Sequence, residues 1–183
     1  GTESDNWALV STMEAHEERG RHLVVSSIEH PAVLNTCAYL EKRGFEVTYL
    51  PVDSYGLVSP DLFESALRPD TVMASVMFAN NEVGTIEPIE TLSGIAHAHG
   101  VLFHTDAVQA FGHVSIACPA MGIDLLSASG HKLHAPKGIG LLYAAPCVGN
   151  TCFMHGGQQE RGRRGGTENT VGIAALAAAV RRL

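Results

Sequence analysis

Apolar runs and amphipathic stretches alternate along the chain. Short runs rich in Val, Ile, Leu and Phe are typical of buried strands, and they occupy residues 22–28, 45–50, 71–78, 101–105 and 123–126, with a weaker candidate at 151–155. Stretches with apolar residues at helical spacing lie between or beside them, at residues 3–19, 32–43, 59–64, 88–99 and 168–182. This alternation predicts an α/β fold, with a doubly wound, mainly parallel sheet in three layers and helices on both faces.

Two helix boundaries have sequence signals. Gly20 follows the stretch 3–19, where a glycine is typical of a helix C-cap. Ser59 followed by Pro60 is typical of an N-cap residue and a first helical position. We therefore expect one helix to end at Gly20 and another to begin after Ser59.

Composition narrows the class of partner. The 183 residues are 45% hydrophobic and 17% charged, which fits one domain with a full core. The formal net charge of −7 argues against binding the nucleic-acid backbone, and no apolar run has the length that spans a bilayer. The four cysteines show no CxxC spacing, as expected for reduced thiols in a cytoplasmic protein. We expect a small-molecule partner, with neither nucleic acid nor membrane.

The stretch 127–140 places Lys132 directly after the predicted strand 123–126. A lysine in a partly desolvated pocket loses its proton more easily and can form a Schiff base with an aldehyde, which is how pyridoxal 5'-phosphate (PLP) is held. Ser127, Ser129 and His131 are then candidates for holding the phosphate. Taken alone, a lysine in a Gly-rich turn is more often a solvated surface residue. Whether Lys132 binds a cofactor therefore depends on the other residues of the chain.

Other polar residues follow predicted strands in the same way. His30, Asn81 and Asp106 each come at or just past a strand end, and Gln109 lies three residues after Asp106. Strands of a parallel sheet end on one side, where α/β proteins bind ligands, so these groups can converge with Lys132.

Asp106 is the most informative of these residues. A buried, unpaired carboxylate at a strand end costs free energy and needs a cation, which a protonated pyridine nitrogen supplies. The alternatives are ordinary structural roles: Asp106 as a helix N-cap, His30 as a surface residue of an X-Pro turn, and Thr2 as the N-cap of the first helix. Thr2 also lies at a helix start, where backbone N–H groups favour an anion.

The motif Ser127-Ala-Ser-Gly-His-Lys132, followed by Pro136-Lys-Gly-Ile-Gly140, resembles the PLP-lysine motif of the cysteine desulfurases and selenocysteine lyases, in the class V aminotransferase group. The similarity runs from Gly1-Thr-Glu-Ser4 to Gly165-Gly-Thr-Glu-Asn169, with one departure at Ala135, where the family usually has Gly. The resemblance implies the large domain of fold type I PLP enzymes, usually seven-stranded with one antiparallel strand. It also implies that residues 1–183 are a single PLP-binding domain of a longer enzyme whose small domain is absent here.

The resemblance assigns roles to residues at matching positions. Lys132 binds PLP covalently and moves a proton during catalysis, and His30 stacks on the ring and shuttles protons. Asp106 holds the protonated pyridine nitrogen, Asn81 bonds the ring oxygen, and Gln109 reaches the ring O3′ or the Schiff base. The remaining cofactor-binding positions are phosphate contacts: Thr2, Ser129, His131 and, from the Gly- and Arg-rich loop 156–167 across a homodimer interface, Thr167.

The implied activity is removal of sulfur from L-cysteine, giving alanine and a protein-bound persulfide for a sulfur-acceptor protein, as in iron-sulfur cluster assembly. Selenocysteine is the alternative substrate. In the family, the nucleophilic cysteine and the arginine that holds the substrate carboxylate lie beyond the region present here, and no cysteine of this chain matches the position: Cys37, Cys118, Cys147 and Cys152.

Two further classes remain open. One is a catalytically incomplete PLP-fold domain that acts as a binding or scaffold module. The other is a histidine metalloprotein, but His97 and His99 lie two residues apart on a predicted helix and face different directions, so we expect no metal.

Overall fold

The chain forms one twisted, mostly parallel sheet. The computed structural model describes residues 1–149 and 151–183. Its six strands lie in the order β2-β1-β3-β4-β5-β6, and β6 alone is antiparallel, paired with β5. Their bounds are β1 (His22–Ser26), β2 (Glu46–Leu50), β3 (Thr71–Ser75), β4 (Leu102–Asp106), β5 (Leu125–Ser129) and β6 (Gly140–Ala144). The predicted α/β fold with a mainly parallel sheet is confirmed, although β6 was not among the predicted strands.

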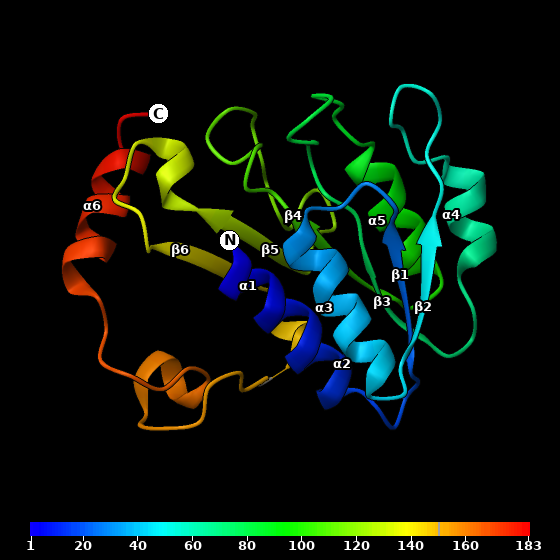
Figure 1. The fold of residues 1–183 in the computed structure, drawn as a ribbon, viewed down its shortest axis with the longest axis horizontal. Coiled ribbons are helices and arrows are strands. Elements are labelled where there is room, and N and C mark those ends of the chain that lie inside the picture. The colour runs from blue at the N-terminus through cyan, green and yellow to red at the C-terminus, as the bar shows by residue number, and fades with distance from the viewer. Residues whose placement is uncertain (150) are drawn as a thin grey trace.

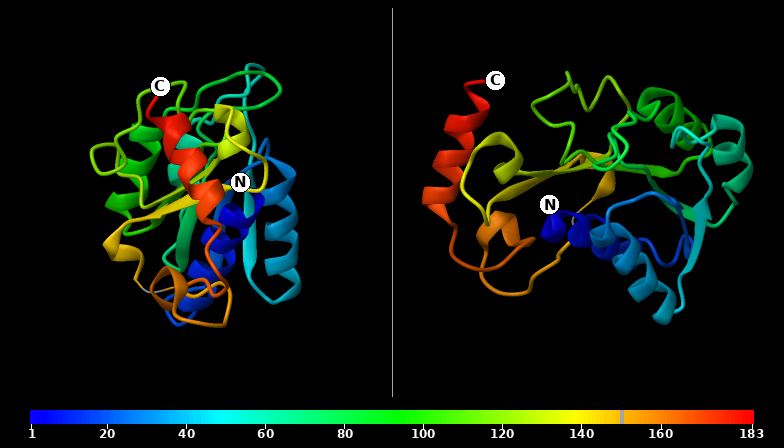
Figure 2. Two further views of the ribbon diagram at one scale, coloured as in Figure 1. Left: turned by 90° about the vertical axis from the view of Figure 1, so that its left-hand side faces the viewer. Right: turned by 45° about the horizontal axis from the view of Figure 1, so that its top comes forward.

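Helices cover both faces of the sheet (Figure 1, Figure 2). One face packs on α3 (Pro31–Lys42) and on a continuous N-terminal helix made of α1 (Thr2–Asn6), the π-helical segment η1 (Trp7–Ser11) and α2 (Thr12–Ala15). The other face packs on α4 (Pro60–Ala66) and α5 (Ile89–Ala98). Every residue of β1, β3, β4 and β5 is buried, which is why these strands are apolar without alternation.

The two cores contain the largest buried side chains. Leu9, Met13 and Leu40 lie on the N-terminal-helix side, whereas Phe63 and Phe103 pack edge to face on the other. Each fully buried side chain of this size contributes about 1.5–3 kcal/mol of transfer free energy. The sheet that positions the site is therefore packed on both faces by buried side chains.

Two local predictions were wrong. The first helix ends at Ala15, so Gly20 is not its C-cap. A Cβ at Gly20 would lie 2.1 Å from the carbonyl oxygen of Asp70, so the glycine permits a close approach of two backbones. Residues 151–155 form no strand, and only an isolated bridge joins Met154 to Arg164.

Other boundaries agree with the prediction. The hydroxyl of Ser59 accepts the N–H of Leu62 at 3.4 Å, with Pro60 at the first helical position of α4. The last helix is α6 (Thr170–Val180), which lies at the β6 end of the molecule beside η2 (Gly130–Leu133) (Figure 2).

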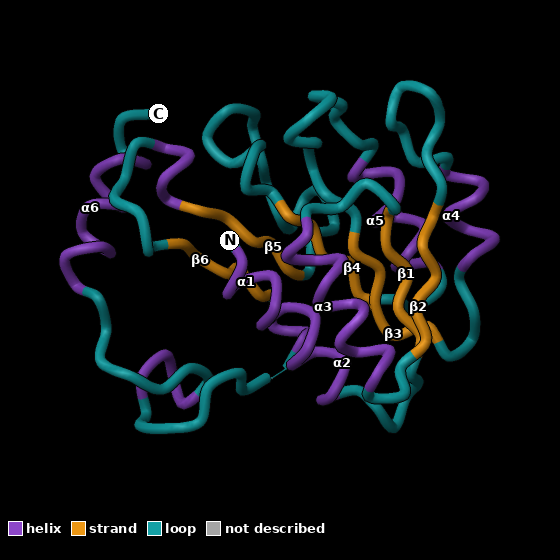
Figure 3. The backbone as a smooth tube through the Cα atoms, viewed as in Figure 1, coloured by secondary structure: helices purple, strands orange, loops and turns teal. Residues whose placement is uncertain are grey.

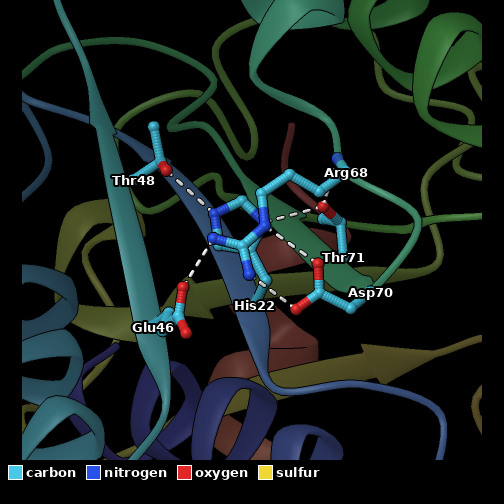
Figure 4. Close-up of polar contacts among 6 residues, drawn as sticks. All are labelled: His22, Glu46, Thr48, Arg68, Asp70 and Thr71. Carbon is cyan, nitrogen blue, oxygen red and sulfur yellow. Dashed lines mark hydrogen bonds and ion pairs between the residues drawn. The ribbon is translucent and has the colours of Figure 1, made fainter.

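A polar cluster around His22 joins the amino ends of three strands (Figure 4). The buried ring of His22 contacts the hydroxyls of Thr71 (2.7 Å, from Nδ1) and Thr48 (2.8 Å, from Nε2). Burial, followed by the charge of Arg68, lowers the pKa of His22. Arg68 in turn pairs with two carboxylates, Glu46 and Asp70, at 2.6 Å each. These contacts tie β1 to β2 and β3 at the amino end of the sheet.

The loops after β2, β3 and β4 gather along the opposite, carboxyl-terminal edge (Figure 3). Ligands of open α/β sheets bind at this edge. The fold thus places the predicted strand-end residues on one side.

Candidate functional site

A cavity of about 200 Å³ opens at the carboxyl ends of the strands. The structure brings eight of the nine expected site residues to its wall: Thr2, His30, Asn81, Asp106, Gln109, Ser129, His131 and Lys132. They come from the first helix and from the segments that follow β1, β3, β4 and β5. Convergence of residues spread over 130 positions of the chain is the main feature of the site.

Asp106 is the last residue of β4 and is 4% exposed. Its Oδ1 accepts the N–H of Val108 at 2.9 Å, which fixes the carboxylate and caps the turn after the strand. No helix begins there in the part of the chain that the structure describes, so the helix N-cap interpretation does not apply. Burial raises the pKa of Asp106, opposed by the Val108 N–H and by His30. A cation in the cavity would stabilise its charged form.

Lys132 lies in η2, the short turn that directly follows β5. Gly130 begins this turn, and a Cβ there would lie 2.9 Å from Ile139 Cγ2 and 3.1 Å from the Ile139 carbonyl oxygen. Glycine is therefore required where the chain returns toward β6. Ala135, the departure from the family motif, donates its N–H to the Gly130 carbonyl at 3.0 Å, and the turn accepts its methyl group because residue 130 has none.

One end of the cavity suits an anion. Thr2 lies in the first turn of the N-terminal helix, whose unpaired N–H groups favour negative charge. Ser129 and His131 lie beside it, with Ser129 Oγ and His131 Nδ1 2.7 Å apart. A Cβ at Gly1 would lie 2.8 Å from Val108 Cγ2, so the backbone approaches closely here.

Ser127 does not take part in this anion site, and the expectation that it helps hold a phosphate is wrong. Its side chain is fully buried, it does not line the cavity, and its hydroxyl lies 3.1 Å from His104 Nε2. Ser127 and Ser129 are two residues apart, which would place them on the same face of a regular strand. Ser129 is the last residue of β5, where the chain turns, and of the two only Ser129 lines the cavity.

The paired asparagines after β3 have different roles. Asn80 is buried, and its side chain accepts the N–H groups of Glu82 and Val83 and donates to the carbonyl of Ile28. Asn81 is exposed and lines the cavity. The first asparagine holds the loop, which leaves the second available to a ligand.

His30 is the N-cap residue of α3 and lines the same cavity. Its Nδ1 accepts the N–H of Ala32 at 3.1 Å, so the ring caps the helix. A nitrogen that accepts a hydrogen bond carries no proton, so Nε2 carries the proton of the neutral ring and can donate a hydrogen bond.

The sequence analysis missed Asp5 and Met77, which also line the cavity. Asp5 is 1% exposed and lies on the helix face that buries Ala8, Leu9 and Thr12. An acidic residue on the apolar face of an amphipathic helix was the signal that could have found it. Met77 is an apolar residue after a strand and gave no signal.

Thr167 lies apart from the other expected residues. It is exposed and lines a second, larger cavity of about 740 Å³, which shares Gly1, Thr2 and Ser129 with the first. The side of this cavity near Thr167 carries Arg164, whose guanidinium pairs with Glu3 at 2.8 Å.

The two histidines considered as metal ligands, His97 and His99, have separate partners, and so does the buried His104. His97 contacts Asp124, His99 contacts Glu64, and the buried His104 contacts Ser75. The described residues include no group of three His, Cys, Asp or Glu side chains placed to hold a metal ion. Within the same residues, no helix combines the length and apolar character needed to cross a membrane.

Comparisons with known proteins agree with this geometry. A family model described as Aminotransferase class-V matches residues 1–183. The chain is 57% identical over 176 residues to the cysteine desulfurase IscS of Methanosarcina thermophila, covering 96% of this chain and 44% of the relative. It is 54% identical over 180 residues to the cysteine desulfurase of Gluconacetobacter diazotrophicus, covering 98% of this chain and 45% of that relative. The chain thus spans less than half the length of these relatives.

Solved structures give the same picture. A structure described as SspA in complex with cysteine superimposes with a TM-score of 0.95 and 44% identity, covering 100% of this chain and 53% of that one. DndA from Streptomyces lividans gives a TM-score of 0.90 and 38% identity, covering 99% of this chain and 52% of the other.

Proposed function

The chain belongs to the class-V aminotransferase family, and we propose that the protein is a PLP-dependent cysteine desulfurase in which residues 1–183 are the single PLP-binding large domain. It would remove sulfur from L-cysteine and leave alanine and a protein-bound persulfide. The observation that carries this proposal is the cavity at the strand ends, where Lys132, His30 and Asp106 meet. Relatives at 57% and 54% identity that are named cysteine desulfurases support the reaction class.

The residues of the cavity fit PLP. Asp106 and Asp5 are two buried acids, and Asp5 Oδ1 has no hydrogen-bond partner, so this part of the cavity suits a positively charged ring nitrogen. The other end offers the helix start, Ser129 and His131 to an anionic phosphate. Lys132 lies on the same wall as these two residues. PLP has an aldehyde for Lys132, a ring nitrogen for the buried acids and a phosphate for the anion-binding end of the cavity.

PLP, when bound, supplies an aldehyde that joins an amine and a ring that accepts electrons from the bonds at the substrate Cα. Lys132 Nζ would hold the aldehyde carbon and, once displaced by the substrate amine, would carry the proton taken from the substrate Cα. Asp106 would face the ring nitrogen and favour its protonated form. His30 would cover the ring face and shuttle protons, while Asn81 and Gln109 would donate to the ring oxygen.

The sulfur-accepting thiol is proposed to lie outside residues 1–183, together with the arginine that binds the substrate carboxylate. Burial raises the pKa of Cys37 to about 12, and it also raises the pKa values of Cys118 and Cys147, so none of the three is a favoured thiolate. Cys152 lies in the loop after β6 and does not line the Lys132 cavity. Selenocysteine is the alternative substrate, because sulfur or selenium selectivity depends on those outside residues.

The proposal also covers the oligomeric state, the sulfur acceptor and the compartment. The enzyme works as a homodimer, with Thr167 contacting the phosphate of the neighbouring subunit. It passes sulfur to an acceptor protein in iron-sulfur cluster assembly, a role that the name of the Methanosarcina relative supports. It acts in the cytoplasm, where cysteines without a pairing pattern stay reduced.

Borohydride reduction followed by peptide mapping tests the proposal. Reduction fixes the carbon-nitrogen bond between the cofactor and its lysine, and we expect the label on Lys132 alone in the full-length protein. Lys132→Ala should abolish labelling, whereas Lys137→Ala, which changes an exposed lysine of the same loop, should not. Label on Lys137 or Lys42 would contradict the assignment of Lys132.

A further inference from the structure

Asp5 is a buried acid that the proposed reaction does not use. It is 1% exposed, it lines the same cavity as Asp106, and its Oδ1 has no hydrogen-bond partner among the described residues. The nearest ionisable nitrogen is His104 Nε2, at 3.9 Å, which is too far for a hydrogen bond. A carboxylate in this position would be a buried charge without a partner.

The histidine cannot provide the missing charge. Burial lowers the pKa of His104 to about 3, so the ring is neutral at physiological pH. Its two nitrogens lie within hydrogen-bond distance of the hydroxyls of Ser75 (2.8 Å) and Ser127 (3.1 Å), which occupies them without creating a cation. Lys132 lines the same cavity, but no ion pair among the described residues joins it to Asp5, which leaves a proton on the carboxyl group as the way to neutralise Asp5.

The surroundings of Asp5 favour that proton. Burial raises its pKa to about 7, and the negative charge of Asp106 acts in the same direction. The Ser127 hydroxyl and the Gly1 ammonium act in the opposite direction. In a longer chain, a peptide bond at Gly1 removes that ammonium and leaves the carboxyl more strongly protonated. The other ionisable groups that line the cavity are His30, His131 and Lys132. Glu29 is buried outside the cavity lining, and the charges of Asp106 and Asp5 help to raise its pKa after burial.

Two buried carboxyl groups that line one cavity repel each other when both are ionised. Resting on the proposed function, we infer that Asp5 and Asp106 hold one proton between them in the cofactor-free site, and that this proton leaves the pair when PLP with its positively charged ring nitrogen binds. An O–H bond of the carboxyl pair breaks and the proton passes to solvent, with no oxidation or reduction. Asp5 is thus a positioning residue that acts through Asp106: it shares a proton in the empty site and leaves Asp106 ionised once the ring nitrogen is present.

The cofactor-free protein tests the first half of this inference. Infrared difference spectroscopy of the full-length protein, stripped of PLP, detects the C=O stretch of protonated carboxyl groups. Between pH 5.5 and pH 8.5, about one such band should disappear with a midpoint at about 7 or above, and Asp5→Asn should remove that titration. Glu87→Gln is the matched control, because Glu87 is also buried, has a raised pKa and an unpartnered oxygen, but does not line the cavity.

Proton counting tests the second half. Calorimetric titration of PLP in buffers of different ionisation enthalpy gives the number of protons exchanged on binding. At pH 6, the wild type should release about one proton more than Asp5→Asn, because only the wild type holds a proton on the carboxyl pair. The difference should shrink as the pH rises above the midpoint of the infrared titration. Glu87→Gln should behave as the wild type at each pH.

The outcomes separate this inference from the proposed function. If PLP binds to Lys132 but wild type and Asp5→Asn exchange equal numbers of protons at pH 6, the sharing of a proton is refuted and the cofactor assignment stands. If PLP does not bind, the infrared titration still decides whether the carboxyl pair holds a proton. Should Asp5→Asn fail to fold, the wild type alone suffices: a protonated-carboxyl absorbance at pH 6 that PLP binding leaves unchanged overturns the inference.

Discussion

His104 Nε2 and Asp5 Oδ1 lie 3.9 Å apart in the interior of the protein, yet they form no ion pair. Burial moves the two groups toward their neutral forms, lowering the pKa of His104 to about 3 and raising that of Asp5 to about 7. Between these two pH values both side chains are uncharged. The contact therefore acts as polar packing behind the cavity, and it makes the stability of the fold depend on pH.

The first prediction concerns this pH dependence. An acid whose folded-state pKa is raised adds stability below its unfolded pKa, near 4, and that stability is lost as pH rises to the folded value near 7. Relative to Asp5→Asn, the wild type should lose about 1.4 kcal/mol of unfolding free energy per pH unit in this window and nothing more above it. Urea denaturation of the cofactor-free, full-length proteins measures the difference. Parallel curves for the two proteins from pH 4.5 to 7 would contradict a raised pKa.

The second prediction concerns the antiparallel pairing of β5 and β6. A Cβ at Gly140 would lie 2.6 Å from the carbonyl oxygen of Ala128, so Gly140→Ala must move one strand away from the other. We expect a loss of about 1–3 kcal/mol in unfolding free energy, because both contacting groups near this point are backbone. Gly94→Ala is the control, since Gly94 lies within α5 with no atom within 4 Å of an added Cβ. That substitution should stabilise the protein by about 0.5–1 kcal/mol. Equal stability of the two variants would exclude the clash.

The third prediction concerns Thr167, which lies outside the Lys132 cavity of its own chain. If it contacts phosphate across a dimer, Thr167→Ala should weaken PLP binding about tenfold, as expected for one hydrogen bond to a charged group. Thr170→Ala, an exposed threonine that lines neither cavity, should leave binding unchanged. Sedimentation of the full-length protein provides the second measurement. A monomer that retains full PLP occupancy would rule out the contact between subunits.

The sequence allowed the parallel sheet and most of the site to be predicted, because both depend on local pattern. Buried strands such as β3 are continuous apolar runs, and a polar residue such as Asp106 at the end of a strand lies at the sheet edge. Family resemblance then assigned chemistry to positions that spacing alone left open.

The features that were missed depend on contacts distant in sequence. Gly20 resembles a helix cap until Asp70 is seen against it, 50 residues later. Strand β6 is an edge strand with partly exposed residues, so its run lacks the signature of a buried strand. Asp5 appears as an ordinary acid near a helix start until tertiary packing covers that face. The roles of such positions can be stated only once the fold is known.

The last prediction concerns Asp106→Ala in the full-length enzyme. The variant removes the group that keeps a proton on the pyridine nitrogen, while Lys132 remains free to bind the aldehyde. Breaking a buried charge pair on one side costs about 3–5 kcal/mol, so PLP should bind more weakly. Turnover at saturating PLP should fall much further than occupancy, because a neutral ring accepts electrons from the Cα bond poorly and the loss appears mainly in the transition state.

Asp124→Ala is the matched control for Asp106→Ala, since Asp124 is also buried but does not line the cavity and instead accepts the N–H of Phe103 at 2.8 Å. That variant should lose stability without a selective loss of turnover once PLP is saturating. Comparing turnover per bound PLP in the two variants separates the chemistry from general destabilisation. If Asp106→Ala turns over at the wild-type rate at full occupancy, Asp106 is not the partner of the ring nitrogen, and its carboxylate serves only to fix the turn through Val108.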